Sequence, residues 1–253
     1  ISERKLNINR NSLKSGLASK RTRDFWKKVV KQNKISYNIF GTKTGRLTTK
    51  KNSFPILTLD TSFRSVINPT NDWLVELDFN AAELRVLLSL SGNEQPSEDL
   101  HEWNMKNVFN RKGMTREAAK KRVFSWLYNP TKKDVSLSKK YDREAVLEKH
   151  YSPAKGQVKT PFSRSIPADE YHALNYIVQS TTSDLFLRRM IEVFKFLKDK
   201  KSFISFSVHD SLVIDLADDE RHHLPEIVKI FSDTELGTFR VNVKAGKNFG
   251  KMQ

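Results

Sequence analysis

Residues 203–216 read Phe-Ile-Ser-Phe-Ser-Val-His-Asp-Ser-Leu-Val-Ile-Asp-Leu. Two alternating apolar runs flank His209-Asp210, a pattern that predicts a β-hairpin with a carboxylate at its tip. A second carboxylate, Asp78, ends the apolar run that starts at Trp73. Either aspartate alone is a common turn former. Brought side by side at two strand ends, they would form a site for the hard divalent cations used in phosphoryl transfer.

The bulk composition is that of a globular protein. The chain has 253 residues, enough for one large or two modest domains, and 38% of them are apolar. No apolar run approaches the length of a membrane span, so we expect no membrane partner. It has no cysteine, which excludes disulfides and thiolate metal sites. We therefore expect a cytoplasmic protein. Residue 1 is Ile, and the chain is expected to be part of a longer protein or a processed one.

The net charge of +16 is unevenly distributed. Residues 1–51 contain 15 Lys and Arg against two acids, and residues 111–164 contain 15 against five. Two basic blocks thus bracket an acidic segment, as expected if basic arms bind a polyanion around a carboxylate centre. A generally basic, solvated surface would give the same totals.

The periodicity predicts a few antiparallel strands packed on long helices, an α+β fold. The expected strands are 63–68, 73–79, the hairpin 203–216 and a last strand near 239–243. The expected helices are 81–91, 115–128, 141–150, 168–201 and roughly 218–233, with irregular polar segments at 93–113 and 131–165.

Residues Arg116, Lys120, Phe124 and Tyr128 recur at four-residue steps on the helix expected at 115–128. This spacing aligns them on one face, with a drift of about 40° per step. A triphosphate could lie along the two cations while its base meets Phe124. A basic helix with an aromatic edge buried in the core is the other interpretation.

From about residue 37 onward, the chain resembles the polymerase module of the family A DNA polymerases. The segments that carry this resemblance are Thr44-Gly-Arg46-Leu-Thr-Thr, Asp78-Phe-Asn-Ala-Ala-Glu83-Leu-Arg85, Asp99-Leu-His101, Arg116-xxx-Lys120-xxx-Phe124-xxx-Tyr128, Asn175-xxx-Gln179 with Asp184, and Val208-His-Asp210. They occur in the order that the family shows.

The resemblance implies a right-hand polymerase fold, in which an antiparallel palm sheet packs on helices. Residues 37–91 would form the first part of the palm, 92–165 the helical fingers and 166–253 the second part of the palm. Residues 1–36 would be a basic thumb remnant or linker.

The resemblance also implies a template-directed DNA polymerase that adds dNMP units to a primer 3′-hydroxyl. Asp78 and Asp210 would be catalytic metal ligands holding two Mg²⁺ ions, replaceable by Mn²⁺, roughly 3.5–4 Å apart. Lys120 would be catalytic and, with Arg116 and Phe124, would bind the dNTP.

Two further residues would adjoin the dNTP. His101 would lie near its triphosphate. Glu83 would crowd the 2′ position of the sugar and so exclude ribonucleotides. The alternative is that Glu83 is an ordinary acidic residue, placed there because the dipole of a helix N-terminus favours negative charge.

Other residues would contact template or primer. These are Tyr128, Arg46, Thr44, Asn175, Gln179, His209 and Arg85. Arg46 would donate hydrogen bonds either to minor-groove acceptors or to a phosphate. His209 would either position the primer terminus or pack against its neighbours. Asn175 and Gln179 would either face DNA or form hydrogen bonds with partners in the core.

The chain departs from the family at several positions. Ser125 and Asn129 replace glycines of the finger helix, Ser211 replaces an acid after the catalytic aspartate, and Tyr171 replaces an arginine. A long thumb and a 3′–5′ exonuclease cluster are missing. We therefore expect a split or truncated, phage-like polymerase to which a second polypeptide supplies thumb and exonuclease.

Two other functions stay open. A single-subunit, phage-type RNA polymerase shares the aspartates and a related finger helix, but Glu83 argues against it because an RNA polymerase must admit the 2′-hydroxyl. A non-catalytic, basic DNA-binding polymerase relic would not need Asp78, Asp210, Arg116 and Lys120.

Overall fold

The computed structural model describes residues 5–110 and 113–253, and the described residues form two compact units. The first unit comprises 5–78, 189–231 and 241–253, and the second 79–110, 113–188 and 232–240. Residues 1–4 of the predicted thumb remnant and 111–112 of the predicted fingers lie outside the described residues. The division into palm, fingers and thumb remnant stays a prediction.

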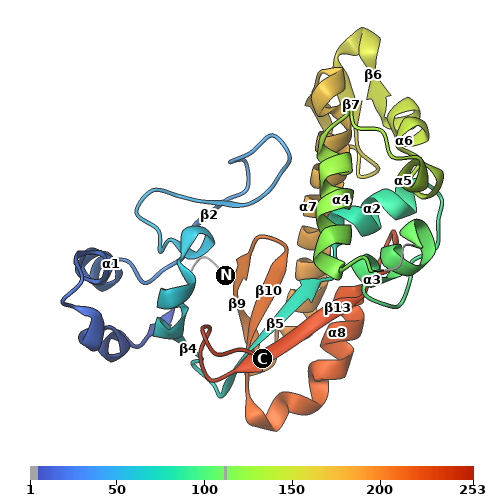
Figure 1. The fold of residues 1–253 in the computed structure, drawn as a ribbon. Coiled ribbons are helices and arrows are strands. Elements are labelled where there is room, and N and C mark those ends of the chain that lie inside the picture. Colours follow the sequence, from blue (N-terminus) through green and yellow to red (C-terminus); the bar gives the residue numbers. More distant parts are fainter. Residues whose placement is uncertain (1–4, 111–112) are drawn as a thin grey trace. The chain divides into compact units, whose positions relative to one another are not determined.

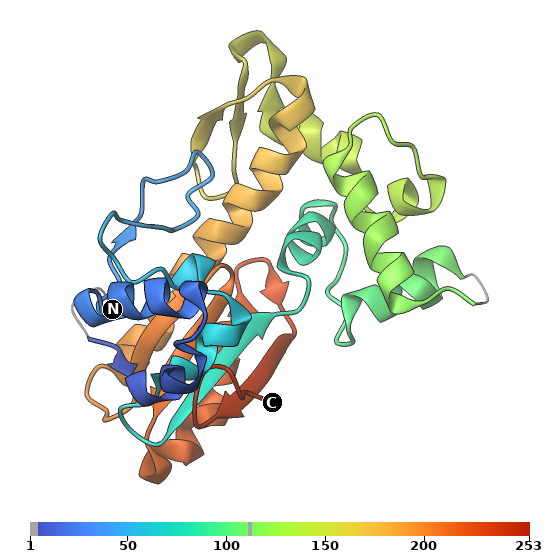
Figure 2. The same ribbon diagram turned by 60° about the vertical axis from the view of Figure 1, so that its left-hand side comes forward.

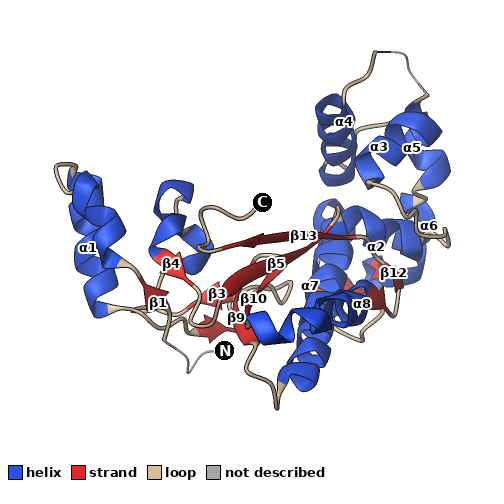
Figure 3. Cartoon of the chain, turned by 90° about the horizontal axis from the view of Figure 1, so that it is seen from below, coloured by secondary structure: helices blue, strands red, loops and turns tan. Residues whose placement is uncertain are grey.

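The first unit is built around a four-stranded sheet with the strand order β13-β5-β10-β9. Its members are β5 (Trp73–Phe79), β9 (Phe203–Val208), β10 (Ser211–Leu216) and β13 (Val241–Gly246). β10 pairs antiparallel with both β5 and β9, and Figures 1 and 3 show the four strands side by side. The predicted hairpin and the predicted strand 73–79 are therefore confirmed.

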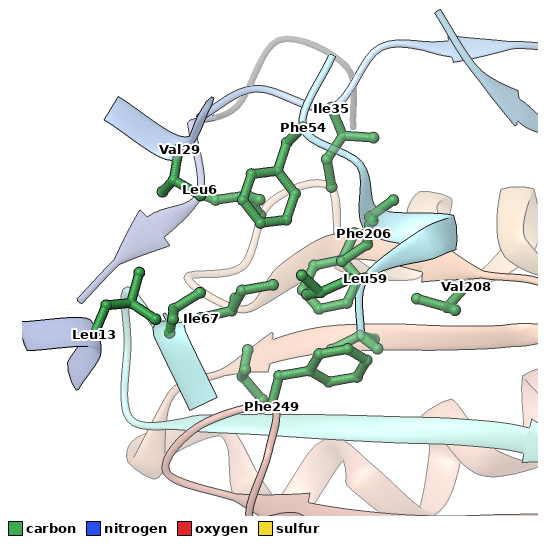
Figure 4. Close-up of a cluster of buried hydrophobic side chains, with 14 residues drawn as sticks. Leu6, Leu13, Val29, Ile35, Phe54, Leu59, Ile67, Phe206, Val208 and Phe249 are labelled. Carbon is green, nitrogen blue, oxygen red and sulfur yellow. The ribbon is translucent and has the colours of Figure 1, made fainter. Parts of the chain in front are cut away.

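The N-terminal segment packs into the core of this unit. It contains β1 (Asn7–Ile8), a 3-10 helix (Arg10–Gly16) and α1 (Lys20–Lys31). Its buried residues Leu6, Leu13, Val29 and Ile35 join one hydrophobic cluster with side chains of the sheet. Figure 4 shows this cluster, in which the rings of Phe206 and Phe249 meet edge to face with centroids 5.1 Å apart.

Short elements complete the first unit. A small antiparallel pair joins β2 (Tyr37–Asn38) to β3 (Thr48–Thr49), and β1 pairs with β4 (Ile67–Asn68). Two 3-10 helices span Ile56–Thr58 and Thr61–Val66, and a third (Asp218–His223) leads into α8 (Leu224–Ser232).

The second unit is mainly helical. Its elements are α2 (Ala82–Leu90), α3 (Leu100–Asn104), a π-helix (Met105–Phe109), α4 (Arg116–Tyr128), α5 (Val135–Lys140), α6 (Arg143–His150), a 3-10 turn (Pro153–Lys155), β6 (Tyr151–Ser152), β7 (Gln157–Lys159), β8 (Ser165–Pro167), β11 (Asp233–Thr234) and β12 (Gly237–Thr238). The long helix α7 (Glu170–Leu197) begins in this unit and ends in the first. The sheet β6-β7-β8 lies beside the amino-terminal end of α7 (Figure 2).

Two predictions about local structure were wrong. Residues 63–68 form mostly a 3-10 helix rather than a strand, because the side chain of Asp60 accepts the backbone N–H of Ser62 and caps a helical turn. The segments 93–113 and 131–165, predicted to be largely irregular, contain regular structure: α3 and a π-helix in the first, and α5 and most of a three-stranded sheet in the second. No helix in the described part of the chain is both long and apolar enough to cross a membrane.

Candidate active site

Asp78 and Asp210 lie at neighbouring strand ends of the four-stranded sheet. Asp78 is next to last in β5, and its partner across the β5–β10 pairing is Ser211. Asp210 directly precedes Ser211 at the hairpin tip. The other tip residue, His209, has a φ of 53°, in the left-handed region that most side chains avoid. The fold of the first unit thus brings the two predicted metal-binding aspartates together.

The surroundings of Asp78 disfavour its charged form. The pKa of Asp78 is raised to about 6, mainly by burial and also by the negative charges of Glu76 and Asp210. A hydrogen bond from Asn242 and the positive charge of Lys244 lower this pKa but do not cancel the increase. Negative charge is therefore crowded around this carboxylate, and a cation at this position would relieve it.

The pKa of Asp210 is also raised, mainly because the carboxyl is buried, although Arg46 and His209 lower it. The Nη2 atom of Arg46 lies 3.9 Å from Oδ2 of Asp210. Thr44, two residues earlier, is buried, and His209 is exposed at the tip. The predicted primer-contacting residues Arg46 and His209 therefore adjoin one of the two aspartates.

The donor set fits a magnesium ion. Mg²⁺ binds through one or two carboxylates and keeps water or substrate oxygens in its other positions. Asp78 and Asp210 supply two carboxylates, while nearby Glu76 accepts a hydrogen bond of 3.0 Å from the hydroxyl of Ser211. Among the described residues, no group of three or more His, Cys, Asp or Glu side chains is arranged to hold a metal ion.

Helix α4 of the second unit carries the predicted nucleotide-binding stripe. Its cap is Thr115, whose side chain accepts the backbone N–H of Ala118 at 3.2 Å. The residues buried on its core face are Ala119, Val123, Trp126 and Leu127. The predicted stripe, Arg116, Lys120, Phe124 and Tyr128, is half-buried or exposed. The rings of Phe124 and Tyr128 lie parallel with centroids 5.9 Å apart. The stripe therefore is not part of the core, and its side chains are accessible to a ligand.

Tyr128 also reaches the helix that follows Asp78 in the chain. Its hydroxyl donates a hydrogen bond to the carboxylate of Glu83, in the first turn of α2. Glu83 has 7% of its surface exposed. The carboxylate predicted to test the sugar is thus held in place by the last residue of the stripe.

His101 adjoins the stripe as a buried, neutral imidazole. Burial, followed by the nearby charges of Arg116 and Lys120, lowers its pKa to about 4, although Asp99 and Glu117 act in the opposite direction. Among the described residues, no hydrogen-bond partner lies within reach of its Nδ1 atom.

Arg85 was predicted to contact template or primer, but its side chain has no exposed surface. It donates hydrogen bonds to the backbone carbonyls of Asn80, Pro96 and Glu98, each at 2.8 Å. A guanidinium buried in this way does not reach DNA in this conformation, so the prediction of DNA contact is corrected. Arg85 instead fixes the loop that leads to α3.

Asn175 and Gln179 are half-buried, one turn apart on α7. Asn175 lines a cavity of about 210 Å³, together with Tyr128 and the exposed Tyr171. Further along α7, Asp184 accepts hydrogen bonds from Nε of Arg164, at 3.0 Å, and from its Nη2. Within the second unit, the structure therefore brings Asn175 beside the stripe and engages Asp184 elsewhere.

Sequence reasoning assigned no role to several residues that shape these sites. Asn242 and Lys244, which lower the pKa of Asp78, belong to β13. This strand is hydrogen-bonded to β5 in the sheet but lies far from β5 in the sequence. Asp99 forms an ion pair with Arg116. It was quoted in a motif, but no local signal pointed to that pairing.

Comparisons with known proteins point to one family. Residues 142–252 match the family described as DNA polymerase family A. The chain is 28% identical over 241 residues to the thermostable DNA polymerase I of Thermus thermophilus, a match that covers 76% of this chain and 29% of that protein. It is 32% identical over 90 residues to DNA polymerase I of Borreliella burgdorferi, covering 34% of this chain and 10% of that protein. The chain therefore spans less than a third of the length of these curated relatives.

A solved structure gives the same fold. It is described as the POL domain of Pol1 from M. smegmatis in complex with DNA primer-template and dNTP. The TM-score is 0.72 at 16% sequence identity, and the match covers 96% of this chain and 56% of that one. At this identity, the likeness is informative about the fold alone.

Proposed function

The chain is related to the family A DNA polymerases, and we propose that it adds deoxynucleotides to a primer 3′-hydroxyl on a DNA template. The observation that carries the proposal is the pairing of β5 with β10, which sets Asp78 beside the hairpin tip that bears Asp210. Two aspartates with raised pKa values at adjacent strand ends suit divalent cations.

Asp78 and Asp210 would bind two Mg²⁺ ions, with Mn²⁺ as a substitute. Such ions supply Lewis-acid stabilisation of the attacking and leaving oxygens during phosphoryl transfer. The aspartates would supply the negative charge that binds the ions. The positive charge of Arg46 lowers the pKa of Asp210 and so favours its charged form.

In the second unit, Arg116 and Lys120 would bind the triphosphate, and Lys120 would offset charge that develops on the departing pyrophosphate. Phe124 offers its ring to the base. His101 presents an unpaired, buried Nδ1 atom beside the two cations. A neutral imidazole can donate a hydrogen bond to a phosphate oxygen without adding charge.

Glu83, held by Tyr128, would select the sugar by occupying the space that a 2′-hydroxyl needs. Arg46, Thr44, His209, Tyr128, Asn175 and Gln179 would serve template and primer. Arg85 is left out of this set because its donors are bound to the backbone carbonyls of Asn80, Pro96 and Glu98.

The direct test is extension of a labelled primer on a defined template, with Mg²⁺ and either dNTPs or rNTPs. Incorporation of dNMP that is lost in Asp78→Asn would support the proposal. Incorporation of rNMP alone would indicate an RNA polymerase, and incorporation unaffected by Asp78→Asn would overturn the catalytic assignment.

A further inference from the structure

The carboxylate of Asp99 receives more hydrogen bonds than an ordinary helix cap. The backbone N–H groups of His101 and Glu102 donate to its Oδ1, each at 3.0 Å, and cap α3. The side-chain amide of Asn80 donates to Oδ2 at 2.7 Å. Arg116 donates from Nε at 3.2 Å and from Nη2 at 2.8 Å. Asp99 is therefore fixed from several sides, and it holds Arg116 through a forked pair of hydrogen bonds.

Asn80 and Arg85 anchor this arrangement to the segment that follows Asp78 in the chain. The side-chain oxygen of Asn80 accepts two hydrogen bonds, one from the backbone N–H of Leu100 at 2.9 Å and one from Nη2 of Arg85 at 3.2 Å. Because Asn80 and Arg85 are themselves buried, the position of Asp99 is set by the core of the second unit rather than by a mobile surface loop.

Arg116 has one edge of its guanidinium occupied and the other turned outward. The edge formed by Nε and Nη2 contacts Asp99. On the remaining edge, the one contact of Nη1 with a described residue is a long one of 3.5 Å to the exposed Glu117. The side chain of Arg116 is 41% exposed. A guanidinium carries N–H donors on both edges, so the outer edge is available to an oxyanion.

We propose that Asp99 is a positioning residue for the nucleotide triphosphate: it holds the Arg116 guanidinium in one orientation, with the outer edge ready for a phosphate. The inference rests on the proposed function, because it gives Arg116 the triphosphate as its ligand. It concerns how that cation is prepared for the ligand.

The alternative is that Asp99 competes with the triphosphate for Arg116. The geometry favours positioning, because Asp99 uses only the inner edge of the guanidinium and its own oxygens already accept donors from Asn80, His101 and Glu102. Its charge is thereby largely compensated. Holding a long side chain in its bound orientation before the ligand arrives removes an ordering cost that binding would otherwise bear.

The test is Asp99→Asn, which has nearly the same shape and still caps α3 but places an amide against the guanidinium. Thermal unfolding is measured first. Steady-state primer extension then separates KM for the dNTP from kcat, and titration calorimetry measures binding of inorganic tripolyphosphate without divalent cations. We expect both KM and the tripolyphosphate Kd to rise about three- to tenfold, the effect of freeing one long side chain, with kcat changed much less.

A matched control lies on the same helix. Arg122 of α4 pairs with Asp134 at 2.6 Å, and Asp134 caps α5 by accepting the N–H of Leu137. Asp134→Asn is therefore the same chemical change at another helix cap, and it should leave KM and Kd unchanged. In an Arg116→Ala background, Asp99→Asn should add no further effect if it acts through Arg116.

An unchanged or lowered KM and Kd in Asp99→Asn would overturn the inference, and a lowered value would indicate competition. If Asp99→Asn does not fold, Asp99→Ser keeps a capping oxygen and removes the carboxylate, and the same outcomes apply. If the wild-type chain extends no primer, the proposed function fails, whereas the tripolyphosphate comparison still decides the role of Asp99.

Discussion

The hydroxyl of Tyr128 donates a hydrogen bond to the carboxylate of Glu83, linking the last turn of α4 to the first turn of α2. Glu83 is therefore held at a defined position. A carboxylate that excludes a 2′-hydroxyl by occupying its space needs such a fixed position. The link joins two motifs that are 45 residues apart in the sequence.

We predict that Glu83→Ala lowers the preference for dNTP over rNTP by about ten- to a hundredfold, the range typical for removing one steric contact. The measurement is the ratio of kcat/KM for matched dNTP and rNTP in primer extension. Tyr128→Phe, which keeps the ring but removes the donor, should reduce the ratio less. An unchanged ratio in Glu83→Ala would show that the sugar is tested elsewhere.

Replacing Asp78 should abolish activity and, without metal, stabilise the chain. The pKa of Asp78 is raised to about 6, so the folded state holds this proton more tightly than the unfolded state. The contribution of Asp78 to stability therefore falls as pH rises from about 4 to about 6. At pH 8 in EDTA, Asp78→Asn should raise the free energy of unfolding by about 1–3 kcal/mol, a range reduced for partial exposure. At pH 4, the difference should vanish.

The same variant should lose the thermal stabilisation that Mg²⁺ or Mn²⁺ gives the wild-type chain, and nucleotide incorporation should fall at least about a hundredfold. Asp219→Asn is a suitable control, because Asp219 is exposed and pairs with Lys201. Wild-type metal stabilisation in Asp78→Asn would exclude this carboxylate as a ligand.

Sequence periodicity was sufficient for the elements that carry the two aspartates. Alternating apolar residues define β5, β9 and β10, and the two-residue break at His209-Asp210 joins β9 to β10. The pairing of β5 with β10, which sets Asp78 opposite Ser211, joins segments that are far apart in the sequence. The α+β fold class and the likeness to a polymerase domain were confirmed. Local patterns were enough to find these strands because each strand is half or fully buried.

The residues that the sequence did not predict depend on contacts between distant segments. Asp99 pairs with Arg116 across 17 residues, and Arg164 with Asp184 across 20. Charge spacing within a helix cannot reveal such pairs. Arg85 was assigned to DNA from the family resemblance alone, whereas its donors satisfy carbonyls inside the second unit.

His101 should make stability fall in mild acid. Its pKa is lowered to about 4, so between its ordinary value and 4 the unfolded state binds a proton that the folded state does not. The contribution of His101 to the free energy of unfolding should therefore decrease as pH falls from about 6.5 to about 4, by up to about 3 kcal/mol. His101→Gln should flatten this part of the profile in urea unfolding, and His172→Gln, an exposed control, should not. Equal slopes in all three proteins would contradict the assignment.

Residues 5–36 should contribute to the stability of the whole first unit, because Leu13 and Val29 belong to the same hydrophobic cluster as Phe54 and Phe206. Leu13→Ala should lower the free energy of unfolding by about 2–4 kcal/mol, as buried leucine truncations do. Phe40→Ala is the contrasting control: Phe40 is 85% exposed, and its truncation should change stability by less than about 0.5 kcal/mol.

Hydrogen exchange at the amides of β9 and β10 shows where the effect appears. Faster exchange there in Leu13→Ala would mean that the N-terminal segment and the sheet unfold together, whereas loss of protection confined to α1 would mean that this segment is only attached to a unit that folds without it.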